Sequence, residues 1–116
     1  MNFFFFIRIN LKIEIVLIII EKSMAKVNLN LLNIFYLQIK EKSIEYNGRT
    51  IKEVISKFVK DHGHKLDVQM LNKNKNKLDK QILILVNGRN IKYLNNYKTE
   101  LKDGDNIYLS VPLAGG

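Results

Sequence analysis

Hydrophobic and polar positions alternate at several places along the chain, and this pattern predicts strands that are buried on one face. It predicts a first strand over residues 26–31, a shorter second strand over 42–46 and a last strand over 106–111. Residues 81–86 are apolar from Ile82 onward, which favours a strand that is buried on both faces or central in its sheet. Residues 91–94 are a candidate short strand.

One amphipathic helix is indicated after residue 50. Its apolar residues recur at i, i+3, i+4, i+7 and i+8, and so share one face: Ile51, Val54, Ile55, Phe58 and Val59. Thr50 and Glu53 fit a capping box, in which Thr50 accepts from the Glu53 N–H and Glu53 reaches back to the Thr50 N–H. Gly63 suits a left-handed stop at the end of this helix. Residues 33–40 are also apolar, but their pattern leaves helix and strand open.

Turn signals separate these elements, and they are Asn47-Gly48, Asn87-Gly88 and Asp103-Gly104-Asp105. Residues 67–80 are predicted to form a loop with a short helical turn near 68–71. The order is strand, strand, helix, strand, short strand, strand, which predicts an α+β domain with a small mixed sheet packed on one main helix. We expect the last strand to lie in the sheet and to release the C-terminal tail at the sheet's edge.

Residues 1–23 differ from the rest of the chain. They contain four consecutive phenylalanines, a strand-like alternation over residues 7–15 and a fully apolar run over 16–20. Arg8, Lys12 and Glu14 interrupt the roughly 18–20 apolar residues that a membrane span needs, so we expect no membrane association. The segment also lacks the features of a signal peptide.

Our hypothesis is that translation begins at Met24 and that residues 1–23 are a mis-assigned start. If the segment belongs to the protein, we expect an exposed, aggregation-prone strand or an interface. The predicted organisation is therefore an atypical N-terminal extension over residues 1–23, a domain over 24–111 and a tail over 112–116.

Composition narrows the possible functions. The chain has 116 residues, enough for one domain, and its lack of cysteine excludes disulfides, thiolate catalysis and thiolate metal sites. The net charge of +8 favours acidic partners. The lysine-rich stretch over residues 73–80 holds no aromatic residue, which favours a solvated loop over a nucleic-acid site. His62 and His64 have no partner at metal-ligand spacing, so we predict no metal site.

The chain ends in Gly115-Gly116, carried on Val111-Pro112-Leu113-Ala114. Because glycine has no Cβ, a Gly-Gly end can enter a channel that is too narrow for other residues. The terminal carboxylate then lies at the tip of a thin arm, where another protein can activate it. A frayed terminus is the alternative.

The chain resembles β-grasp sulfur carriers of the MoaD/ThiS type, which are ubiquitin-like, and it is closer to MoaD, the small subunit of molybdopterin synthase. The resemblance covers residues 26–116. Its densest part is Leu85-Val86-Asn87-Gly88-Arg89-Asn90-Ile91, followed by Leu94, Thr99, Leu101, Gly104-Asp105 and Pro112-Leu113-Ala114-Gly115-Gly116. The family often has an aromatic residue and two prolines before the tail, whereas this chain has Ser110 and Val111 at the first two of those positions and retains only Pro112.

The resemblance implies a carrier without catalytic machinery or a bound cofactor, located in the cytoplasm. An adenylyltransferase of the MoeB/ThiF type would use ATP to convert the Gly116 carboxylate into an acyl-adenylate, and a sulfur donor protein would displace AMP to leave a thiocarboxylate. Val111, Pro112, Leu113, Ala114 and Gly115 would form the partner-binding tail, and the large subunit of molybdopterin synthase would be the receiving partner.

Three alternatives remain open from the sequence. The sulfur could instead pass to the thiazole of thiamine, to another metal-pterin pathway or to tRNA. The chain could be a ubiquitin-like modifier that forms an isopeptide bond through Gly116. It could also be a basic nucleic-acid-binding module, which would not need Gly116, and we do not expect this.

Overall fold

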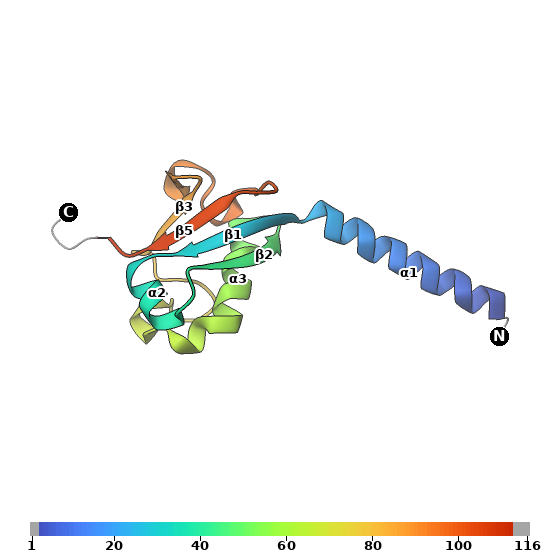
Figure 1. Ribbon diagram of the computed structural model, residues 1–116, viewed down its shortest axis with the longest axis horizontal. Helices are drawn as coiled ribbons and strands as arrows, with labels where there is room; N and C mark the ends of the chain where they lie inside the picture. The colour runs from blue at the N-terminus through green and yellow to red at the C-terminus, as the bar shows by residue number, and fades with distance from the viewer. Residues whose placement is uncertain (1–2, 113–116) are drawn as a thin grey trace.

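The structure is a computed structural model, and it describes residues 3–112. A five-stranded mixed sheet forms the centre of the protein (Figure 1). The strands lie in the order β2-β1-β5-β3-β4. β1 runs parallel to β5, and the other neighbours are antiparallel. The strand bounds are Ala25–Leu31 (β1), Ser43–Gly48 (β2), Leu83–Val86 (β3), Arg89–Asn90 (β4) and Asn106–Ser110 (β5).

Helices occupy the remaining regular segments, and the ambiguous residues 33–40 are mainly helical. The α-helices are α1 (Phe3–Ser23), α2 (Asn33–Ile39) and α3 (Ile51–His62). Four 3₁₀ turns follow α3, at Gly63–Lys65 (η1), Val68–Met70 (η2), Ile91–Tyr93 (η3) and Asn96–Lys98 (η4). The short helical turn predicted near residues 68–71 is thus confirmed. The predicted strand over 91–94 is wrong, because the Asn90 side chain accepts the Lys92 N–H and starts a 3₁₀ turn instead.

The core lies between the sheet and the helices. The alternation in β1 buries Ala25, Val27, Leu29 and Leu31 while Lys26 and Asn28 are exposed. Ile107 and Leu109 of β5 join the same core as the five predicted apolar residues of α3, all of which are buried. Phe35 of α2 meets Phe58 of α3 with ring centroids 6.5 Å apart. The predicted α+β architecture is therefore confirmed.

The two ends of α3 differ from the predicted capping. The Glu53 N–H donates to Thr50 Oγ1 at 3.4 Å, as expected. The Glu53 carboxylate, however, accepts from the Arg49 N–H at 2.7 Å rather than from Thr50. Gly63 has a right-handed φ of −57°, so the predicted left-handed stop is wrong. The chain continues directly into η1, where the Leu66 N–H donates to the Gly63 carbonyl.

The predicted strand over residues 81–86 is shorter and less buried than its composition indicates. β3 begins at Leu83, and only Ile84 and Val86 are buried. It lies beside β5, but its other neighbour β4 has only two residues. Leu83 and Leu85, on the other face of β3, are only half-buried, so its apolar run does not mark full burial on both faces.

The N-terminal extension is helical, which corrects the strand expected for residues 7–15. α1 projects away from the domain along its long axis (Figure 1). An isolated strand would leave its backbone N–H and C=O groups without a neighbouring strand, whereas a helix pairs them internally. Its described apolar side chains are exposed: Ile9, Leu11, Ile13, Ile15, Val16, Leu17, Ile18, Ile19 and Ile20. Within the residues that the structure describes, no helix meets the length and hydropathy needed to span a membrane.

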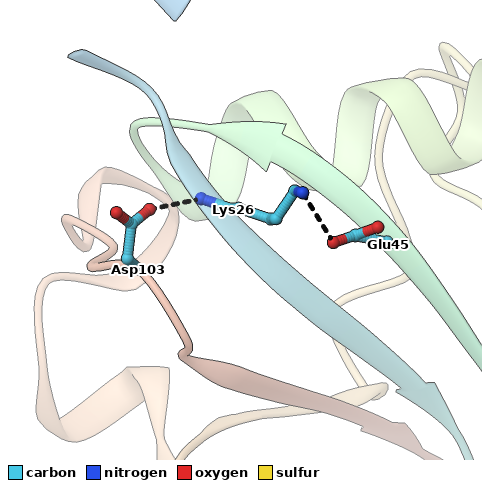
Figure 2. A network of polar contacts seen from close by, with 3 residues as sticks. All are labelled: Lys26, Glu45 and Asp103. Atoms are coloured by element: carbon cyan, nitrogen blue, oxygen red, sulfur yellow. Dashed lines mark hydrogen bonds and ion pairs between the residues drawn. The ribbon is translucent and has the colours of Figure 1, made fainter. Parts of the chain in front are cut away.

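Lys26, near the start of β1, contacts both β2 and the turn that precedes β5 (Figure 2). Its backbone N–H donates to Asp103 Oδ1 at 2.8 Å, and its Nζ lies 3.4 Å from Glu45 Oε1 on β2. Its carbonyl accepts the Gly104 N–H at 2.9 Å. These bonds fix the turn before β5, and β5 then carries the chain to the opposite end of the sheet.

Candidate functional site: the root of the tail

The last strand delivers the tail from the middle of the sheet. β5 lies between β1 and β3, with Leu109 opposite Leu31 and Ser110 opposite Leu83. It lies in the sheet as predicted, and its position in the strand order is central. Because strands hold β5 on both sides, the point at which the chain leaves the sheet is fixed.

Asn33 holds the residues on either side of this exit. The Asn33 Nδ2 donates to Ser110 Oγ at 2.8 Å, and the Val111 N–H donates to Asn33 Oδ1 at 3.3 Å. The Leu32 N–H donates to the Leu109 carbonyl at 3.0 Å. The Ser110 hydroxyl also donates to the Val111 carbonyl at 3.2 Å. We call the group formed by Asn33, Ser110 and Val111 the tail clamp.

Two residues of the predicted tail lie within the described part of the chain. Val111 is half-buried and packs against the core, and Pro112 is exposed. Proline has no N–H and cannot continue the ladder with a neighbouring strand. This agrees with the end of β5 at Ser110. Leu113, Ala114, Gly115 and Gly116 lie outside the described residues.

A cavity of about 360 Å³ adjoins the tail root. Val111 and Pro112 line one part of it, together with the apolar side chain of Ile34. The acidic residues Asp67 and Asp79 also line this cavity. The tail of a chain with net charge +8 therefore emerges beside an acidic hollow.

The sheet face opposite α3 carries a second hollow, of about 470 Å³. Leu85 and Tyr108 form a cross-strand pair in it, and Leu32 and Asn106 also line it. Neither Leu85 nor Tyr108 was predicted from the sequence to be a site residue. The signal was present, since alternation in the last strand sets Tyr108 opposite the buried Ile107 and Leu109.

The remaining candidates do not form a site near the tail. The His62 ring, at the C-terminal end of α3, contacts the Phe58 ring in a tilted arrangement with centroids 5.8 Å apart. Across residues 3–112, no group of three or more metal-ligating side chains gathers to hold an ion. The lysine-rich stretch is ordered by Asn72, whose Oδ1 accepts the N–H groups of Asn76 and Lys77.

The mixed sheet, the helix α3 across it and the chain leaving a central strand define a ubiquitin-like β-grasp protein. The model of the ThiS family matches residues 30–116. The chain therefore belongs to the ThiS family, a family of ubiquitin-like sulfur carriers and modifiers. No curated protein matches the chain.

Solved structures agree with this assignment. The chain is similar to the small archaeal modifier protein 1 (SAMP1) from Methanosarcina acetivorans, with 26% identity, a TM-score of 0.69 and coverage of 80% of this chain and 98% of that one. It is also similar to a chain of the BexX/CysO complex from Amycolatopsis orientalis, with 28% identity, a TM-score of 0.62 and coverage of 78% and 99%.

A third structure supports the fold alone. It is the putative molybdopterin converting factor, subunit 1, from Pyrococcus furiosus, with 23% identity, a TM-score of 0.57 and coverage of 77% and 99%. The family assignment itself rests on the match of the ThiS family model to residues 30–116.

Proposed function

We propose that the protein is a sulfur carrier whose Gly116 carboxylate is first adenylated and then converted to a thiocarboxylate. The observation that carries this proposal is that the ThiS family match extends through Gly116, and so includes the Gly-Gly tail. The position of β5 supports it, because a central strand gives the tail a rigid base.

The chemistry requires activation by another protein. A carboxylate resists attack by a sulfur nucleophile, because its negative charge repels the nucleophile and oxide is a poor leaving group. In the proposed sequence, a carboxylate oxygen of Gly116 attacks the α-phosphorus of ATP and pyrophosphate leaves. A sulfide equivalent from the donor protein then attacks the acyl carbon and AMP leaves. The resulting thiocarboxylate is the nucleophile that the carrier delivers.

The proposed partners follow from this sequence. An adenylyltransferase of the MoeB/ThiF type binds ATP and the tail, and a sulfur donor protein supplies the sulfide equivalent. The carrier contributes no catalytic residue other than its own terminal carboxylate. We infer that the receiving partner is the large subunit of a molybdopterin synthase, on the basis of the tail and the strand–turn–strand segment that resemble MoaD.

The proposal is tested by the intact mass of the full chain after incubation with ATP, a sulfide source and the native adenylyltransferase. We expect a mass gain equal to the exchange of one oxygen for sulfur. Deletion of Gly116 should abolish the gain. Gly115→Val should also abolish it, because a β-branched side chain adds bulk where a narrow channel admits only glycine.

Gly115→Ala is the matched control for steric size, and we expect a slower reaction rather than none. A Gly115→Val variant that gains sulfur at the wild-type rate would contradict the channel argument. Addition of the molybdopterin synthase large subunit and its pterin precursor then tests the pathway. Failure to consume the thiocarboxylate there would redirect the search to the thiazole and tRNA acceptors.

A second function is favoured by the 26% identity to an archaeal modifier protein. In this case the adenylate of Gly116 would react with a lysine amine of a target protein and release AMP. Immunoblotting of cell extracts under denaturing conditions separates the two functions. A modifier gives a ladder of heavier adducts that disappears when Gly116 is deleted, whereas a dedicated carrier gives a single band.

A further inference from the structure

The exit of the tail from the sheet has an unusual chemical feature. Pro112 has no N–H, so the last backbone donor before it is that of Val111. Strand pairing has already ended at Ser110, so no neighbouring strand accepts this donor. The Asn33 side chain accepts it instead, at 3.3 Å.

The Asn33 side-chain amide makes a second hydrogen bond, through its nitrogen. The Asn33 Nδ2 donates to Ser110 Oγ at 2.8 Å, so one side chain spans two consecutive residues of the chain. Asn33 itself has a positive φ of 43°, a conformation that asparagine tolerates better than most residues. The bend at the start of α2 therefore aims the amide at the end of β5.

We propose that Asn33 is a positioning residue for the tail, acting through the tail clamp to set the direction in which Gly116 is presented to the activating enzyme. This inference rests on the proposed function. A tail with a fixed root loses less conformational freedom when an enzyme channel binds it. Breaking the clamp should raise the KM of the enzyme for the carrier and leave kcat unchanged, because the reacting carboxylate is unaltered.

Asn33→Gly is the variant that removes the clamp without adding strain, because glycine adopts a positive φ freely. Asn33→Asp is the conservative rescue, since a carboxylate can accept from both the Val111 N–H and the Ser110 hydroxyl. Asn96→Gly is the matched control. Asn96 is exposed, has a similar φ of 50° and lies in η4, on a different element from the tail clamp.

Two measurements are made on each full-length variant. The first is amide hydrogen exchange at Val111 by NMR, which reports the clamp directly. The second is ATP–pyrophosphate exchange by the native adenylyltransferase as a function of carrier concentration. A single neutral hydrogen bond is worth roughly a two- to tenfold factor in an equilibrium constant. We therefore expect Asn33→Gly to accelerate Val111 exchange and to raise KM by a factor in that range, and Asn33→Asp to reverse both effects.

The two measurements together distinguish a positioning role of Asn33 from a purely structural one. If Asn33→Gly accelerates Val111 exchange but leaves KM at the wild-type value, the clamp is only structural and the inference is overturned. If neither quantity changes, or if Asn96→Gly raises KM equally, it is also overturned. If the wild-type chain supports no pyrophosphate exchange, the proposed function fails first, and the positioning role fails with it.

Discussion

Replacement of Gly48 by alanine tests how closely α3 approaches the sheet. Gly48 is the last residue of β2, and it pairs with Ala25 of β1. A Cβ added at this position would lie 2.8 Å from Val54 Cγ2 and 3.4 Å from Glu53 Cβ. Val54 is fully buried, so its methyl group has no open space into which to move. We expect Gly48→Ala to force β2 and α3 apart.

The cost follows from the severity of the overlap. Overpacking of a close-packed core costs about 1–3 kcal/mol. In a domain of this size each kcal/mol lowers the melting temperature by roughly 4–8 °C. Val54→Ala removes the obstructing methyl group, so the double variant should lose less stability than the sum of the two single variants. We expect a coupling energy of about 1 kcal/mol or more, measured by urea unfolding followed by circular dichroism.

Gly88→Ala is the control for this experiment. Gly88 has a φ of +87°, and an added Cβ would meet nothing within 4 Å. Its cost of about 1–2 kcal/mol comes from backbone strain alone and should be independent of Val54. A Gly48→Ala variant that unfolds like the wild type, or whose cost adds simply to that of Val54→Ala, would refute the close approach of α3 to β2.

Two further substitutions test α3 and its packing. Thr50→Ala removes the oxygen that accepts the Glu53 N–H at 3.4 Å, and we expect a loss of about 0.5–1 kcal/mol in urea unfolding. Burial, and secondarily the Asp61 carboxylate, raise the pKa of Tyr46 well above its usual value of 10.0. The folded state therefore favours the neutral phenol, and this contribution to stability is complete below pH 10.0 and is lost as the pH rises above it. Tyr46→Phe should reduce the loss of unfolding free energy above pH 10.0, measured by unfolding experiments on both sides of that pH. An unchanged dependence of the unfolding free energy on pH would contradict the assignment to Tyr46.

The two Asn-Gly dipeptides show what local sequence signals can and cannot resolve. At Asn87-Gly88 both residues have positive φ, of 51° and 87°, as the turn signal predicts. Gly48 instead lies within β2. A side chain at this position would collide with α3, so the need for glycine comes from tertiary packing rather than from a turn. The dipeptide predicted a turn correctly at one place, while at the other the glycine serves packing.

Hydrophobic periodicity predicted an element correctly where that element packs one face against the core, and it was wrong where the element does not. The stripe of α3 and the alternation of β1 and β5 predicted the buried residues correctly, because a single core sets their period. The alternation over residues 7–15 had no core to face, and those residues form the helix α1. The strand predicted over residues 81–86 included Gln81 and Ile82, but both precede the first paired residue of β3, Leu83.

The tail illustrates a different limit. Its proposed chemistry depends on residue types at the end of the chain, which can be seen in the sequence, whereas the contacts at its root involve Asn33, which lies 77 positions before Ser110. No local pattern marks Asn33, since its contacts with Ser110 and Val111 arise only when β1 and β5 pair in parallel and bring the start of α2 to the end of β5. Val111 has a backbone N–H, and such a donor near the surface needs either water or a protein acceptor. The Asn33 side-chain oxygen supplies that acceptor, at 3.3 Å from the Val111 nitrogen, so a polar residue at the start of α2 completes the hydrogen bonding where the pairing of β5 has ended.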